Sequence, residues 1–124
     1  MSFLADNVLD NGVQYITDNG DRIDICSSEP TTATEAQVTN SLGNKSGLTM
    51  GSPENGASSG RRSIVPAITD GSVTATGTAS HWALTSAASP PELIAAGALS
   101  SSQGVTNGNT FTLGAISITI PDVA

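Results

Sequence analysis

Few side chains in this chain could take part in catalysis. His81 is the only histidine and Cys26 the only cysteine among 124 residues. A serine-type triad or an imidazole general base would depend on His81, but no Gly-x-Ser-x-Gly turn surrounds it and it lies beside Trp82 in an alternating segment. Cys26 follows apolar Ile25 and has no basic neighbour that would lower its thiol pKa. We therefore expect a packed or surface histidine, a small core cysteine and no catalytic residue.

The densest group of carboxylates is Asp18, Asp21 and Asp24, which is faintly similar to a calcium-binding loop. Glu29 has the spacing of the final ligand of an EF-hand, but the glycine and apolar positions within the loop are wrong. One cysteine and one histidine do not make a zinc site, and no glycine-rich phosphate-binding fingerprint occurs. The sequence therefore predicts a solvated loop at this point, no metal and no cofactor.

The overall charge is strongly acidic. Eleven acidic residues against four basic ones give a net charge of -7, which leaves no basic surface for a nucleic-acid backbone or an anionic membrane. No segment approaches the roughly 20 apolar residues that span a bilayer, and the N-terminus lacks the basic segment of a secretory signal. We expect synthesis in a cytoplasm, with neither nucleic acid nor membrane as a partner.

The composition predicts one domain, residues 1–124, with a thin core. The chain has 17 Ser and 15 Thr against 24 Val, Ile and Leu. Apolar residues recur at helical intervals over residues 2–18, where Ser2 is a candidate N-cap and Asn19-Gly20 a helix end. Residues 22–27 alternate as a short strand, with Ile23 and Ile25 toward a core and with Arg22 and Asp24 toward water or a partner.

Residues 28–60 are mostly polar and few are large and apolar. A structureless segment longer than about 15 residues is usually functional or disordered, so we interpret residues 28–60 as a long polar loop or as an arm that reaches a neighbouring subunit. From Arg61 to Pro121 the pattern is strongly β. Pro66 predicts an edge or a bulge in the strand over residues 63–68, and Thr69-Asp70-Gly71 predicts a turn.

Longer alternating runs follow in this β core. Residues 72–86 predict one long strand and residues 92–99 another. The final hairpin is predicted across Asn107-Gly108-Asn109, and Gly114-Ala115 is where a bulge would absorb the change of parity before the last strand, which Pro121 ends. Together these segments predict a mostly β fold, an antiparallel β-sandwich or small jelly-roll-like barrel with a short N-terminal helix.

The basic residues are the candidate partner-binding residues. Arg61-Arg62 is the one basic pair, just before a strand. These guanidinium groups could discourage edge pairing, or could make bidentate bonds to carboxylates of an acidic neighbour. Lys45, in the polar segment, is grouped with Arg61 and Arg62 as a partner contact.

The order of segments resembles small virion proteins of tailed bacteriophages. The resemblance rests on the N-terminal helix, the segment from Ile23 to Thr32 with its Ser-Ser-Glu-Pro-Thr-Thr run, and five further segments: Gly60-Arg61-Arg62, Asp70-Gly71-Ser72-Val73-Thr74, Ser80-His81-Trp82-Ala83-Leu84, Gly97-Ala98-Leu99-Ser100 and Val105-Thr106-Asn107-Gly108-Asn109-Thr110-Phe111. It implies a capsid decoration, or cement, protein on the virion surface. The implied partners are the major capsid protein and further copies of the chain, for example in a trimer.

Two other hypotheses stay open at this point. A tail- or fibre-associated protein that binds a host glycan would need exposed aromatic rings, and Tyr15 and Trp82 are the only Tyr and Trp. A hydrolase would depend on His81 and ranks third. A hydroxyl-rich chain with a small core and no reactive constellation is better suited to reinforcing a larger particle, where many weak contacts act together.

Overall fold

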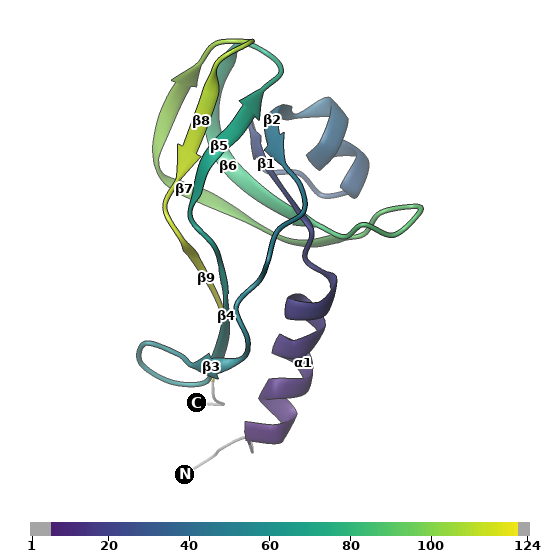
Figure 1. Ribbon diagram of the computed structural model, residues 1–124, viewed down its shortest axis with the longest axis vertical. Coiled ribbons are helices and arrows are strands. Elements are labelled where there is room, and N and C mark those ends of the chain that lie inside the picture. Colours follow the sequence, from purple (N-terminus) through teal and green to yellow (C-terminus); the bar gives the residue numbers. More distant parts are fainter. Residues whose placement is uncertain (1–5, 122–124) are drawn as a thin grey trace.

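The computed structural model describes residues 6–121 and confirms the expected fold class: mostly β, antiparallel, with a short N-terminal helix (Figure 1). Six strands form a curled sheet, here called the large sheet, in the order β7-β6-β1-β2-β5-β8, and three form the small sheet, β3-β4-β9. The elements within the described residues are α1 (Asp6–Asn19), β1 (Arg22–Cys26), the π-helical turn η1 (Glu35–Thr39), β2 (Ser41–Lys45), β3 (Glu54–Asn55), β4 (Arg61–Val65), β5 (Ile68–Val73), β6 (Gly77–Thr85), β7 (Leu93–Val105), β8 (Thr110–Leu113) and β9 (Ile116–Ile120).

Helix α1 packs on the small sheet, mainly against β4. Leu9 and Val13, one turn apart, are buried there, and Gly12 brings the helix close to β9, since a Cβ at this position would lie 2.8 Å from Ile120 Cδ1. Residues 2–5 of the expected helix, with the Ser2 cap, lie outside the described residues. The expected left-handed end is wrong: neither Asn19 nor Gly20 has a positive φ, and the Gly20 amide donates to the Ile16 carbonyl at 2.8 Å.

The main core fills the inside of the large sheet. Ile23 and Ile25 point inward from β1, and their partners on β6, Leu84 and Trp82, share that face. On the outer face, η1 covers the sheet, where Cys26, Ala36 and Ala83 form a second small cluster. The sheet is therefore covered on both faces near β1, and this explains why β1 is buried along nearly its whole length.

The small and large sheets are joined by one bent antiparallel ribbon. Its first half pairs β4 with β9 and its second half pairs β5 with β8 (Figure 1). The ladder is interrupted where Pro66-Ala67 lies opposite Gly114-Ala115, between the pairs Val65–Ile116 and Ile68–Leu113. Pro66 has no amide hydrogen to donate, so the chain changes sheet there.

Two expectations about this ribbon need correction. Pro66 does not lie in an edge strand, because it follows β4, the central strand of the small sheet. The parity change at Gly114-Ala115 is real, but it marks the passage from the large to the small sheet rather than a bulge within one strand. Pro121 follows the last strand, as expected.

The expectation that residues 28–60 form one long arm or loop is wrong for the middle of this segment. Strand β2 lies inside the large sheet, between β1 and β5, and η1 packs on the outer face. Gly43 lets β2 approach β5 closely, because a Cβ there would lie 2.4 Å from the Ser72 carbonyl oxygen. At Gly43 backbone contact replaces side-chain packing, whereas Leu42 of the same strand packs in the main core.

The expected turn at Thr69-Asp70-Gly71 and the single strand over residues 72–86 are also wrong. Thr69-Asp70-Gly71 lies within β5, and the chain turns instead at residues 74–76, between β5 and β6. The amides of Thr74 and Ala75 donate to the Leu42 carbonyl, at 2.8 and 3.2 Å. A long-range contact with β2 therefore outweighs the local turn propensity.

The two strands of the predicted final hairpin do not pair with each other. Strand β7 pairs with β6 and β8 pairs with β5, so the two strands form opposite edges of the large sheet. Residues 106–109 join these edges and are held over the end of β5, where Gly108 N donates to the Val73 carbonyl at 3.0 Å. A four-residue connection spans at most about 18 Å, so the sheet must curl until its edges approach each other at this end.

Strand β7 is irregular at two places. Its pairing with β6 skips residues 99–102 and, nearer its start, Ile94. The first irregularity accompanies a bend in β6 that brings both Ala79 and Trp82, three residues apart, against the main core.

Candidate functional site

Arg61, the first predicted partner contact, connects α1 to the small sheet. Its Nε donates to Asp10 Oδ1 at 2.6 Å and its Nη1 to Asn55 Oδ1 at 2.7 Å. The Arg61 side chain is only 19% exposed. The guanidinium fork therefore holds helix α1 and strand β3 of its own chain together.

We expect Arg61→Ala to lower the free energy of unfolding by about 1–2 kcal/mol, because the Asp10 carboxylate and the Asn55 amide both lose a partner. Urea denaturation followed by circular dichroism measures the change. Arg62→Ala is the matched control, with an expected loss below about 1 kcal/mol. Equal losses for the two variants would contradict the assignment of α1 docking to Arg61.

Arg62 and Lys45, the other two predicted contacts, also face carboxylates of this chain. Arg62 Nη2 lies 3.7 Å from Glu54 Oε2, and Lys45 Nζ lies 2.9 Å from Asp70 Oδ2. Arg62 Nη1 also donates to Ser117 Oγ, at 3.0 Å, so it links β4 to β9. The structure does not bring the three candidates together into one site, and their contact with a partner stays a prediction.

The most buried ion pair was missed from the sequence. Asp24 was expected to face water or a partner, but it is fully buried beneath η1. It accepts two bonds from Arg22, at 2.8 and 3.0 Å, and one from Ser41 Oγ at 2.6 Å. The hydrogen bond to Asp24 raises the pKa of Arg22 above its ordinary value. Alternation alone could not show this, because it cannot tell that a later segment covers the outer face.

Cys26 lies in the outer cluster and is fully buried. Burial, followed by the nearby Asp24 charge, raises the pKa of its thiol from 9.0 to about 12. The thiol is therefore protonated at neutral pH, which agrees with the expected core residue.

We expect alkylation of Cys26 at pH 8 to be at least about 1000-fold slower in the folded protein than in urea, because the thiolate fraction falls with the raised pKa. Because the folded pKa lies above the unfolded one, the protonated thiol stabilises the fold below about pH 9, and this stability is lost as the pH rises toward 12. Iodoacetamide labelling with mass spectrometry measures the rate. Comparable rates in the two states would contradict burial of the thiol.

His81 lies beside Ser80 on β6. Ser80 Oγ is 2.8 Å from His81 Nδ1 and 2.9 Å from the Ser27 carbonyl oxygen. A hydroxyl has one hydrogen, and the carbonyl can only accept, so the bonds are satisfied when Ser80 donates to Ser27 and His81 donates to Ser80. In this arrangement the imidazole does not act as a base toward Ser80.

The carboxylates Asp18, Asp21 and Asp24 do not form a metal site. Asp24 is engaged with Arg22, and Asp18 accepts a hydrogen bond from Gln14 at 2.7 Å. No group of three or more His, Cys, Asp or Glu with the arrangement of a metal site occurs between residues 6 and 121.

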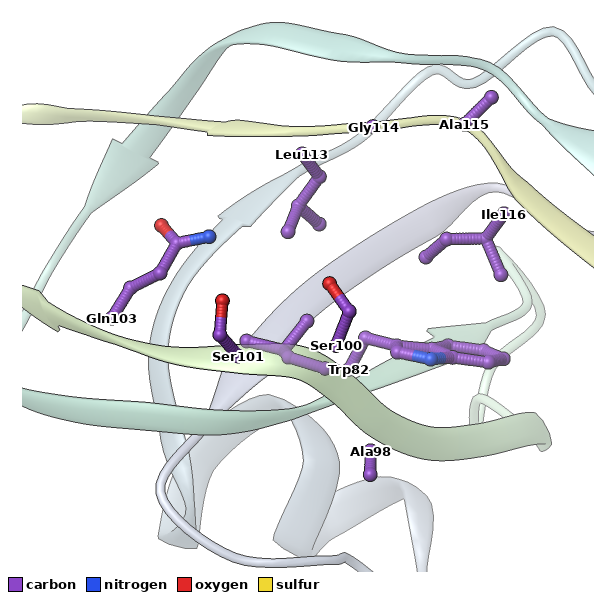
Figure 2. Close-up of a pocket in the computed structure, with 10 residues that line it drawn as sticks. Trp82, Ala98, Ser100, Ser101, Gln103, Leu113, Gly114, Ala115 and Ile116 are labelled. Carbon is purple, nitrogen blue, oxygen red and sulfur yellow. The ribbon is translucent and has the colours of Figure 1, made fainter.

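A pocket lies between the two edges of the large sheet and was not foreseen from the sequence (Figure 2). Its volume is about 290 Å³. Residues 98–101 and Gln103 of β7 form one wall, residues 113–116 the other, and Trp82 of β6 the floor. The walls coincide with the interruptions in both ladders, at residues 99–102 and at Gly114-Ala115. No local pattern predicts this pocket, because its walls meet only through the curling of the sheet.

No family model, curated protein or solved structure matches this chain. Within residues 6–121 the structure contains no helix with the length and apolar character needed to cross a membrane.

Proposed function

We propose that this chain is a structural protein that binds the outside of a bacteriophage capsid and reinforces it, as the decoration-type resemblance implies. The observation that carries the proposal is the distribution of charge. Carboxylates without an ion-pair partner gather on one side of the molecule, which suits attachment by many weak contacts, whereas the charges beside β8 and β9 are paired within the chain.

The basic side chains of residues 6–121 form ion pairs within the chain. Arg22, Lys45, Arg61 and Arg62 each pair with a carboxylate of the same chain. Five carboxylates in residues 9–121 belong to no ion pair: Asp18, Asp21, Glu29, Glu35 and Glu92. Excess negative charge of this kind favours a partner with a basic surface.

These five carboxylates come from one side of the fold. They lie at the end of α1, around η1 and at the β6–β7 connection, which are all on the right in Figure 1. On the opposite side, β8 and β9 come from residues 93–121, which contain no charged residue. The charges of the neighbouring strands are in ion pairs, Lys45 with Asp70 and Arg62 with Glu54. A subunit that attaches through its acidic side would leave the β8–β9 side facing outward.

The side chains that could in principle take part in catalysis support the fold instead of forming a reactive group. Cys26 is buried with a raised pKa, Asp24 is paired with Arg22, and Nδ1 of His81 is within hydrogen-bond distance of Ser80 Oγ. This favours a binding role over turnover. Weak contacts to several shell subunits would then combine into durable attachment.

The test is binding of the purified protein to expanded heads assembled from the major capsid protein alone. We expect saturation at a fixed number of copies per shell, a higher rupture temperature, and weaker binding as salt rises from 50 to about 500 mM because charge attraction is screened. Sedimentation of heads with quantification of the bound chain measures the occupancy.

Asp21→Asn and Glu29→Gln form the test variants, and Asp70→Asn is the matched control because Asp70 is already paired with Lys45. We expect the first two to reduce occupancy and the control to leave it unchanged. No saturable binding would reject the decoration function. Equal losses for all three variants would reject the acidic side as the attachment surface.

A tail- or fibre-associated host-binding protein is the second candidate function. One observation favours it, the pocket with Trp82 at its floor. The two candidates differ in location: fractionation of purified particles into heads and tails would place the chain in one fraction or the other.

A further inference from the structure

We propose that the pocket above Trp82 binds a neutral saccharide. This inference is independent of capsid attachment, because it concerns the isolated chain and a pocket whose lining residues carry no charge. It is supported by the placement of the indole, by a group of polar side chains with no hydrogen-bond partner among residues 6–121, and by the absence of charge from the pocket walls.

The indole of Trp82 lies flat on β7. A Cβ at Gly97 would be 3.0 Å from Nε1, Cε2 and Cζ2 of the ring, so the glycine allows the ring to lie directly on the strand. Figure 2 shows the ring nearly edge-on, with Ile116 and Ser100 on the side of the ring that faces the pocket. One ring face is therefore covered by β7, and the other borders the pocket as a surface for the apolar face of a sugar ring.

The polar groups of the pocket are open to a ligand. Figure 2 shows the hydroxyls of Ser100 and Ser101 and the carboxamide of Gln103 extending from β7 toward the opposite wall. Within the described chain these three side chains make no hydrogen bond to another protein group. A carboxamide both donates and accepts, and each hydroxyl does the same, which suits the hydroxyl groups of a sugar.

The charge of the pocket selects a neutral ligand. None of the pocket residues is charged, and the protein as a whole carries -7. An anionic sugar would be repelled and would find no cation in the pocket walls. The volume, about 290 Å³, lies at the lower end of the range for small-molecule sites, so we expect one or two sugar units to be bound.

An extended peptide fits the pocket less well. A guest strand could pair with either free edge of the large sheet. The ladder of β7 is irregular both at Ile94 and at residues 99–102, and β8 has only 4 residues, Thr110–Leu113. Such bulges are a common protection of edge strands against strand addition. The side chains that surround the pocket, and not the backbone edge, are therefore the groups available for recognition.

The experiment uses the fluorescence of Trp82, the only tryptophan in the chain. The full chain is titrated with glucose, galactose, mannose and N-acetylglucosamine and with disaccharides of each, up to about 50 mM. We expect a saturable change in emission with at least one of them, with a dissociation constant of about 1 mM, as ligands of this size commonly show.

Gln103→Ala is the test variant, with Ser101→Ala as a second one. Both side chains are exposed, so the fold is expected to persist, and circular dichroism confirms it. We expect at least a 10-fold weaker affinity for Gln103→Ala. Thr112→Ala is the matched control, because Thr112 is exposed on β8 next to Leu113 but does not line the pocket. Its affinity should equal that of the parent chain.

Three results would overturn the proposal. The first is no saturable change with any sugar, and the second is unchanged affinity in both pocket variants. The third is a saturable change with an uncharged peptide such as acetyl-Val-Ile-Val-amide but with no sugar. None of these results depends on whether the chain binds capsids, so failure of the saccharide site and failure of the decoration function are distinguishable.

Discussion

Gly60→Ala is expected to lower the free energy of unfolding by about 3–5 kcal/mol, the largest single effect anticipated for this fold. Gly60 has φ +73°, and a Cβ there would lie 2.0 Å from the Ile120 carbonyl oxygen and 2.6 Å from Pro121 Cα. Both contacts are with backbone, so the end of the β4–β9 ladder must move. Thermal unfolding should show a fall in Tm of about 4 °C per kcal/mol lost.

Gly47→Ala is the matched control. Gly47 has nearly the same φ, +72°, but no atom lies within 4 Å of the Cβ position. This variant therefore bears only the cost of the left-handed conformation, about 1–2 kcal/mol. If the two variants lost the same stability, close packing of Gly60 against the last strand would not be a main determinant of the fold.

Asp24→Ala is expected to cost about 2–4 kcal/mol of unfolding free energy, because the Arg22 guanidinium and the Ser41 hydroxyl lose their buried acceptor. Arg22 is 27% exposed and can regain some hydration, so the effect should stay below that of a fully buried pair. Urea denaturation measures the change. The exposed Lys45–Asp70 pair provides the comparison, and Asp70→Ala should cost less than about 1 kcal/mol.

A double substitution separates the contribution of the Arg22–Asp24 ion pair to stability from the cost of leaving one buried charge alone. Replacing Arg22 by Met and Asp24 by Leu removes both charges at once, and we expect a stability close to that of the parent chain because no buried charge is left alone. A loss larger than that of Asp24→Ala would contradict this explanation. It would indicate instead that two other hydrogen bonds account for most of the stability. These run from Arg22 to the Gln37 carbonyl and from Ser41 to Asp24, and they hold η1 and β2 in place.

The sequence was most informative where the structure depends on local periodicity. Alternation correctly indicated β1, and helical spacing indicated α1. Prediction from the sequence failed where a strand pairs with a strand that is distant in the sequence. Asn107-Gly108-Asn109 has the composition of a hairpin turn, yet the apolar faces of β7 and β8 find better partners in β6 and β5. Local turn chemistry fixes the direction of the chain but not which strands pair.

The contacts of the candidate site residues could be predicted from the sequence even less well than the fold. Arg61, Arg62 and Lys45 were identifiable as rare cations, but their partners depend on the tertiary fold. Asp10 is on the N-terminal helix, Asp70 is on a later strand, and Glu54 meets Arg62 only because β3 pairs with β4. The pocket requires Trp82 and Gln103 to meet Leu113, which depends on the curl of the sheet. The parity change at Gly114-Ala115 was visible, but the sequence could not distinguish a bulge from a change of sheet.

The position of the chain on an intact particle tests the proposed decoration function most directly. We expect electron cryo-microscopy of mature phage heads to show this fold at fixed, repeated positions on the shell, with α1 and η1 toward the capsid protein and the Trp82 pocket toward the solvent. Heads without density for the chain, or chains attached through the β8–β9 side, would contradict the central claim.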